Sequence, residues 1–199
     1  HIFPLSILPG TRLAQQRDRY GIEAQSEPPY ELTSSSNWTV EEMELCRRRS
    51  AAVDLFYNSG RAVAFFPAIM HALQIPPSEL FEDFFKWVLQ QEGVEYHDLM
   101  LTDQWAADDV YRMLQGYLCN QLERTGQGHL TSVFLDLLCY HFHYAEMILG
   151  EELLPPQEPF EPQTNLWETP WQRSSKCRLV PFAYEILDLL EVEEMQLDE

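Results

Sequence analysis

The sequence predicts a mainly α fold, a bundle of about five helices with a short N-terminal strand and a minor β element near the C-terminus. Two observations support this prediction. Apolar residues recur at three- and four-residue intervals over most of the chain. Glycine and proline separate these periodic segments by short connections, which is typical of helical bundles. The 199 residues, 45% of them hydrophobic and 13% aromatic, have the composition of a globular protein.

The N-terminal part is predicted to be extended around one short helix. Residues 2–8 form an apolar run typical of a buried strand, which Pro9-Gly10 would end. Thr11 is a suitable cap for a short helix that reaches about Arg19. Residues 22–38 are then expected to be extended, because they lack helical periodicity.

The first long helix begins at a capping box. The Thr39 hydroxyl would accept the amide of Glu42, whose carboxylate would accept the amide of Thr39. Asn58-Ser59-Gly60 interrupts the pattern, and a second helix continues to about Leu73. Pro67 lies inside this second segment and predicts a kink or a restart there.

Three further helices complete the predicted bundle. Pro76-Pro77-Ser78 opens the third helix, with Ser78 as its cap. The fourth helix starts near Thr102. The fifth runs from about His129 to Leu149, and Gly150 would end it.

The C-terminal part differs from the bundle in composition. Residues 155–170 contain five prolines and indicate a linker. Residues 177–182 could form an edge strand, where a proline is tolerated. Residues 185–199 carry seven acidic residues and no basic one, so this stretch would fray or pair with a basic surface.

The charge excludes several classes of partner. Thirteen Lys and Arg against 32 Asp and Glu give a net charge of −19, so neither nucleic acid nor an anionic membrane surface is expected as a ligand. No apolar run reaches the ~18 residues of a membrane span. The chain has no signal peptide and no initiator Met, so we expect an excised piece of a longer cytoplasmic protein.

Cysteine and histidine give a weak metal signal. The four cysteines lack close spacing and are expected to be small buried hydrophobes in a reducing compartment, although a disulfide or a thiolate metal site stays open. His143 and Glu146 are the nearest approach to a helical metal-ligand pair, in reversed order and without a second copy. His141 lies on the apolar stripe, where a hydrogen-bonded core histidine is the alternative. A metal-dependent enzyme built in the bundle therefore remains one hypothesis.

Charged and aromatic residues supply a further hypothesis. Arg47-Arg48-Arg49 is expected to balance Glu41, Glu42 and Glu44 one turn earlier, and His97-Asp98 is expected at a helix start or in a loop.

Tryptophans outside the apolar stripes indicate either a docking surface or packing of the linker on the bundle. Together with the acidic surface, they allow a stand-alone acidic helical protein-interaction module. These tryptophans are Trp38, Trp87, Trp105, Trp167 and Trp171.

Four short stretches, in this order, resemble a known family. The family is the C-terminal helical domain, of unknown function, of cobalamin-binding radical S-adenosylmethionine proteins. Some of these proteins are labelled anaerobic magnesium-protoporphyrin IX monomethyl ester oxidative cyclases. The resemblance is densest over residues 2–66. The four stretches are Leu8-Pro9-Gly10-Thr11, Tyr20-Gly21-Ile22, Pro28-Pro29-Tyr30-Glu31 and Tyr57-Asn58-Ser59-Gly60-Arg61.

The resemblance implies a parent enzyme with a cobalamin-binding domain and a radical barrel ahead of this chain in the same polypeptide. The parent would use a [4Fe-4S] cluster, S-adenosylmethionine and cobalamin, in oxidoreductase or transferase chemistry. Residues 1–35 would be the end of the barrel and the crossing from it. Residues 36–152 would be the bundle, and residues 153–199 the proline-rich linker and acidic tail.

The chain departs from the pattern of the whole enzyme. It has no CxxxCxxC to hold a cluster and no DxHxxG motif for cobalamin, so no catalytic, cofactor-binding or metal residue carries over, and no cofactor is expected in this chain. Arg61, Asn58 and Tyr30 are the candidate contacts to the barrel or its substrate. The leading hypothesis is a non-catalytic accessory domain that covers the barrel and helps to enclose the substrate.

Overall fold

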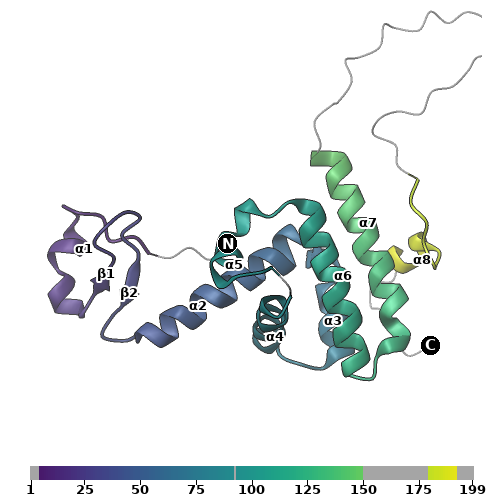
Figure 1. Ribbon diagram of the computed structural model, residues 1–199, viewed down its shortest axis with the longest axis horizontal. Coiled ribbons are helices and arrows are strands. Elements are labelled where there is room, and N and C mark those ends of the chain that lie inside the picture. The colour runs from purple at the N-terminus through teal and green to yellow at the C-terminus, as the bar shows by residue number, and fades with distance from the viewer. Residues whose placement is uncertain (1–4, 92, 150–178, 192–199) are drawn as a thin grey trace, which may run out of the picture.

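The computed structural model describes residues 5–91, 93–149 and 179–191. It confirms a mainly helical fold and places a short antiparallel sheet near the N-terminus (Figure 1). The helices are α1 (Arg12–Gln15), α2 (Val40–Val53), α3 (Phe66–Leu73), α4 (Pro77–Leu89), α5 (Tyr96–Met100), α6 (Ala107–Arg124), α7 (Thr131–Leu149) and α8 (Ile186–Glu191); the strands are β1 (Glu23–Ala24) and β2 (Leu32–Ser34).

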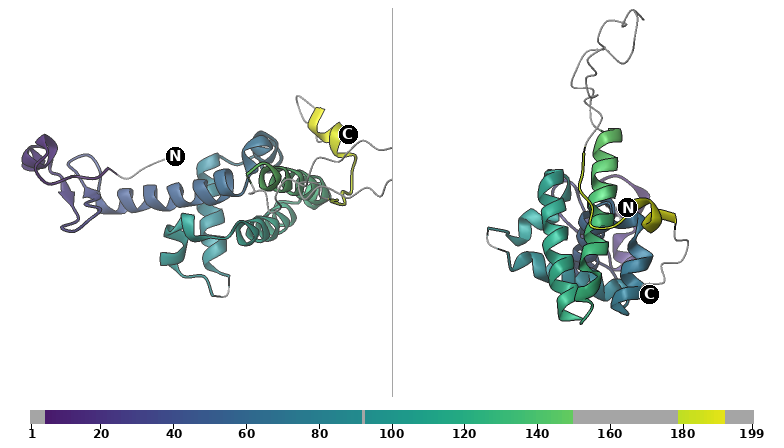
Figure 2. Two further views of the ribbon diagram at one scale, coloured as in Figure 1. Left: turned by 90° about the horizontal axis from the view of Figure 1, so that it is seen from above. Right: turned by 90° about the vertical axis from the view of Figure 1, so that its right-hand side faces the viewer.

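Residues 5–38, here called the N-terminal unit, lie at one end of α2, away from the other helices (Figures 1 and 2). The predicted strand over residues 2–8 is wrong for the part that the structure describes. Ser6 makes an isolated bridge to Glu31, and only Ile7 of residues 5–8 is buried. The pairing of this segment with the hairpin consists of the hydrogen bonds from the Leu32 amide to the Leu5 oxygen and from the Ile7 amide to the Tyr30 oxygen, and it is too short to form a strand. Residues 1–4 lie outside the described part.

The start and end of α2 follow the sequence prediction. The Glu42 amide donates to the Thr39 hydroxyl at 3.2 Å, and the Thr39 amide donates to the Glu42 carboxylate at 2.8 Å, which confirms the capping box. After Val53 the helix widens into a π turn over Asp54–Ser59. Helix α3 starts afresh at Phe66 with Pro67 in its first turn, so the proline marks a restart.

Two predicted helix starts differ from the structure. Helix α4 begins at Pro77 with Pro76 as its cap, so Ser78 falls inside the first turn and does not cap it. The predicted fourth helix starts later than expected, because a 3-10 turn (Thr102–Gln104) occupies its predicted start and α6 begins at Ala107; α5, which lies before it, was not predicted. Asp98 accepts the Glu95 amide at 3.1 Å, which confirms His97-Asp98 as a helix-start pair.

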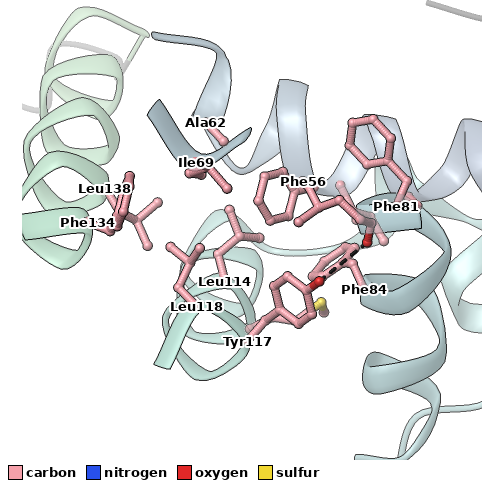
Figure 3. Packing of buried hydrophobic residues seen from close by; sticks show 14 of the residues in the cluster. Phe56, Ala62, Ile69, Phe81, Phe84, Leu114, Tyr117, Leu118, Phe134 and Leu138 are labelled. Atoms are coloured by element: carbon pink, nitrogen blue, oxygen red, sulfur yellow. Dashed lines mark hydrogen bonds between the residues drawn. The ribbon is translucent and has the colours of Figure 1, made fainter. Parts of the chain in front are cut away.

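The core lies between α2, α3, α4, α6 and α7 (Figure 3). Phe56, from the π turn, is at its centre and meets the edges of the Phe84 and Tyr117 rings at centroid distances of 5.2 and 6.0 Å. Edge-to-face contacts of this kind add to the free energy gained by burying the rings. The π turn is therefore part of the core.

The described tryptophans divide between packing and exposure. Trp87 packs on Tyr117 at a ring distance of 5.7 Å, and the indole of Trp105 donates to the backbone oxygen of Asp98 at 2.9 Å. Trp38, in the N-terminal unit, is 48% exposed. Trp167 and Trp171 lie outside the described residues.

The predicted C-terminal β element is not formed by the residues described there. Residues 179–182 have no strand partner, and residues 177–178 lie outside the described part. The chain instead continues into α8, which lies beside α7 (Figures 1 and 2). The predicted linker over residues 155–170 and Gly150 are also outside the described residues. No helix that the structure describes is long and apolar enough to cross a membrane.

Candidate functional site

The break between α2 and α3 is built around Gly60. Its φ is −76°, so its backbone is ordinary, and space is what requires a glycine. A Cβ at this position would overlap the Leu114 side chain of α6 and lie 2.5 Å from the backbone oxygen of Phe56. The break is therefore packed directly against α6.

Arg61 takes the left-handed conformation that usually falls to a glycine, with φ of 60°. Its guanidinium crosses to α7, where Nη2 lies 3.7 Å from Oε1 of Glu146, and both side chains are 29% exposed. Nη1 also donates to the backbone oxygen of Asn58 at 3.4 Å. The Arg61 Nε is buried and makes no hydrogen bond with the described residues. Arg61 thus links the break to α7.

Asn58 stabilises the π turn from within. Its Nδ2 donates to Oδ1 of Asp54 at 2.9 Å, one helical turn earlier. Its backbone oxygen accepts the Arg61 amide at 3.2 Å. Asn58 and Arg61, two of the three predicted site residues, are therefore brought together at one break.

Tyr30, the third predicted site residue, lies elsewhere. It has φ of 58° and closes the turn between β1 and β2, where its amide donates to the Glu27 oxygen at 2.9 Å. Its own backbone oxygen accepts the Ile7 amide at 2.8 Å. The 14 residues of α2, roughly 20 Å of helix, separate this turn from the break at Gly60. The predicted set therefore forms two places and not one site.

Arg47 joins the N-terminal unit to α2, and sequence reasoning missed this role. Its Nη2 donates to the Leu32 oxygen of β2 at 2.7 Å, and its Nε lies 3.6 Å from Oε2 of Glu31. Its Nη1 pairs with Glu44 at 3.4 Å, which the spacing had predicted. The contacts to Glu31 and Leu32 span about 15 residues, and helical spacing carries no signal for them.

The other arginines of this cluster do not simply balance the preceding acids. Arg48 pairs with Glu82 of α4 at 3.7 Å. Arg49 lines an open pocket of about 400 Å³ beside the start of α4. The pocket also contains Glu79, Glu82 and Lys86, so it holds charges of both signs. The predicted local balance with Glu41 and Glu42 is therefore replaced by contacts between helices.

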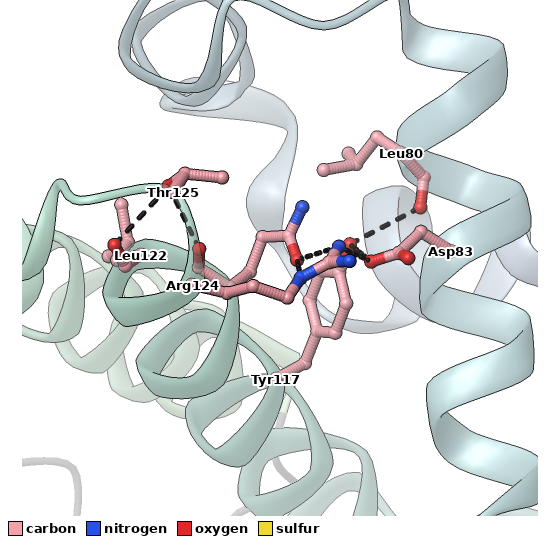
Figure 4. A network of polar contacts seen from close by, with 7 residues as sticks. Leu80, Asp83, Tyr117, Leu122, Arg124 and Thr125 are labelled. Carbon is pink, nitrogen blue, oxygen red and sulfur yellow. Dashed lines mark hydrogen bonds and ion pairs between the residues drawn. The ribbon is translucent and has the colours of Figure 1, made fainter.

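A polar network ties α4 to α6 (Figure 4). The Tyr117 hydroxyl donates to Oδ2 of Asp83 at 3.1 Å, and Nη2 of Arg124 approaches the same oxygen at 2.8 Å. Burial, followed by the charge of Asp83, raises the pKa of Tyr117 far above its ordinary value. The phenol therefore stays protonated and acts as a buried hydrogen-bond donor to Asp83.

The histidine and acid pair that came nearest to a metal motif is engaged elsewhere. His143 lies against Tyr111 at a ring distance of 6.1 Å, while Glu146 pairs with Arg61. His141 stacks on Phe65 at 5.8 Å, and burial lowers its pKa. Three cysteines have free, half-buried thiols: Cys46, Cys119 and Cys139. Cys177 lies outside the described part.

Within the ranges that the structure describes, no three His, Cys, Asp or Glu side chains gather as they would around a metal ion. The features that remain are two surfaces, at the N-terminal unit and at the break, joined by α2.

A family described as a protein of unknown function, DUF4080, matches residues 18–149. The chain belongs to this family. The DUF4080 match begins within the 3-10 turn before β1 (Arg17–Tyr20) and ends at the last residue of α7, so it contains Tyr30, the break and helices α2 to α7. No curated protein and no solved structure matches the chain.

Proposed function

We propose that this DUF4080 chain is the non-catalytic C-terminal accessory domain of a cobalamin-dependent radical S-adenosylmethionine enzyme. It would cover the barrel and help to enclose the substrate. The cobalamin and radical domains of the same polypeptide would be its partners, and the [4Fe-4S] cluster would belong to the parent. One observation carries the proposal: three of the four family-like stretches build the N-terminal unit, which exposes apolar side chains.

The N-terminal unit has little core of its own. Among residues 5–38 the buried side chains are Ile7 and Ile22. Leu8 is 52% exposed, and Tyr20 and Trp38 are also exposed. A two-stranded hairpin with so small a core is only marginally stable in isolation. The unit is therefore suited to packing against a neighbouring protein surface, for which we propose the barrel.

Arg47 would transmit docking of the N-terminal unit to the helical bundle. Arg47 holds β2 to α2, and α2 packs along α4 in the bundle. A barrel that binds the N-terminal unit would therefore also fix the position of the bundle. Radical intermediates need a site closed to water and to stray hydrogen donors, and a packed helical wall supplies such closure.

The proposal is tested on the full-length parent, compared with a variant that lacks residues 39–199. Cleavage of S-adenosylmethionine should persist in the deletion variant, while product formed per cleavage should fall. A full-length Arg47→Gln variant should lose product in the same direction, and Arg112→Gln serves as its control because Arg112 pairs only one turn away. Equal product per cleavage in the intact and deleted proteins would refute an enclosing role.

A second candidate is the stand-alone interaction module. It is favoured by the exposed apolar side chains on the last turns of α7, Tyr144, Ile148 and Leu149. The gene separates the two candidates. A CxxxCxxC stretch encoded upstream in the same reading frame would exclude the stand-alone module, whereas a frame without it would exclude the accessory domain.

A further inference from the structure

Asp136 is a buried carboxylate with an unusual set of partners. It lies on α7 and is 8% exposed. Its Oδ2 accepts two backbone amides, from Ala183 and Tyr184, each at 2.8 Å. These donors come from 47 and 48 residues further along the chain. A buried carboxylate requires such donors, and hydrogen bonds to an ionised acceptor are stronger than neutral ones.

The segment that donates these amides continues directly into α8. Ile186 and Leu189 of α8 pack against the edge of the core beside α7. Leu187, by contrast, is 61% exposed. Among the residues that the structure describes, Asp136 and the packing of Ile186 and Leu189 therefore hold the segment against the bundle.

Two facts indicate that this contact can open without unfolding the bundle. Helix α8 has six residues, and so short a helix does not persist in water without its packing partner. The DUF4080 match ends at Leu149, so the matched bundle does not include α8. Elements with few buried contacts open at lower free energy than the core does.

We propose that Asp136 and the adjoining flank of α7 form a docking site for a short apolar helix that is preceded by two free backbone amides. Residues 183–191 are its resident occupant, and they act as a releasable strap. The inference does not depend on the radical-enzyme assignment, since it uses only contacts within this chain.

Hydrogen exchange on the full chain tests the role of the carboxylate. The Ala183 and Tyr184 amides should exchange about tenfold faster in Asp136→Ala, because each loses a charge-assisted hydrogen bond. Asp136→Asn should give a smaller change in the same direction and guards against a folding defect, which circular dichroism would reveal. Asp103→Asn, at an exposed position, is the charge-matched control. Unchanged exchange at both amides in both Asp136 variants would overturn the proposal.

A peptide added in trans tests the docking site itself. The full chain with Ile186→Asp and Leu189→Asp has its own strap disabled and should bind a fluorescent peptide of residues 179–191, as measured by anisotropy. Wild-type chain should bind the peptide more weakly, since its own strap competes. Adding Asp136→Ala to the disabled chain should abolish binding. Absence of binding to the disabled chain, or equal binding with and without Asp136, would refute the site.

Discussion

Gly60 and Leu114 approach so closely that any Cβ at position 60 would overlap the Leu114 side chain. Gly60→Ala should therefore lower the free energy of unfolding by about 1–3 kcal/mol, the usual cost of overpacking. Urea denaturation would measure it. Gly126→Ala is the comparison, because Gly126 has a positive φ of 76° and open space around it. If Gly60→Ala is the milder of the two, close packing at the break is not the reason for the glycine.

The left-handed backbone of Arg61 gives a second prediction. Arg61→Gly and Arg61→Ala both remove the contact to Glu146, but only glycine adopts this conformation freely. The alanine variant should be less stable than the glycine variant by about 1 kcal/mol. Chemical denaturation of the pair would measure the difference. Glu146→Gln should change stability by less than about 1 kcal/mol, since the ion pair is partly exposed; a larger loss would mean that the pair is a main support of the break.

Tyr117 predicts how stability changes in alkali. Burial is the chief reason that the pKa of Tyr117 is raised in the folded state. Its contribution to the free energy of unfolding is therefore intact below the unfolded pKa of about 10 and is lost as the pH rises above that value. Urea midpoints between pH 8 and about 11 should fall less steeply in Tyr117→Phe than in wild type. Some slope should remain, because burial also raises the pKa of Tyr111. Identical slopes would contradict this account.

At neutral pH the same substitution has a separate cost. Tyr117→Phe leaves Asp83 with Arg124 and removes the hydroxyl donor at 3.1 Å. The free energy of unfolding should fall by about 1–2 kcal/mol, as for a hydrogen bond to a charged group. A loss near zero would indicate that Arg124 alone satisfies Asp83.

His141 predicts the opposite dependence on pH. Burial lowers the pKa of His141 in the folded state. Its contribution to the free energy of unfolding is therefore present above the unfolded pKa of about 6.5 and is lost as the pH falls below that value. His141→Gln should therefore be less sensitive to acid than wild type between about pH 7.5 and 5, as measured by thermal unfolding. His97→Gln, at an exposed position, is the control and should keep the wild-type profile.

Arg47 predicts local opening of the N-terminal unit. Arg47→Gln removes the hydrogen bond to the Leu32 oxygen and the positive charge beside Glu31. Neither Leu32 nor Glu31 is part of the bundle core, so the core should be unaffected. Limited proteolysis should cut within residues 5–38 faster in this variant, with little change in the urea midpoint of the bundle. Arg112→Gln should leave the cleavage rate unchanged. Equal cleavage in both variants would mean that Arg47 does not hold the unit.

The features that were predicted correctly depend on neighbouring residues. Thr39 and Glu42 form their capping box within one turn, and Pro67 restarts a helix by its own geometry, so local sequence was sufficient. The contacts that organise the candidate surfaces join distant residues. Arg47 reaches β2, and Asp136 binds amides more than 40 residues away. No short sequence pattern predicts either of these contacts.

The strand predicted over residues 2–8 shows another limit. An apolar run signals burial only if some other layer covers it, and the described part of this chain provides none for Leu5 or Leu8. The order of the family-like stretches along the chain does not show which of their residues lie together in space. Tyr30 and Arg61, both predicted as contacts to the barrel or its substrate, lie at opposite ends of α2.

Helix α2 runs without interruption from its cap at Thr39 to the π turn that carries Phe56. One end of this rod carries Phe56 in the bundle core, and the other end is joined to β2 by Arg47. The aromatic packing around Phe56 therefore sets the direction in which the hairpin projects from the bundle.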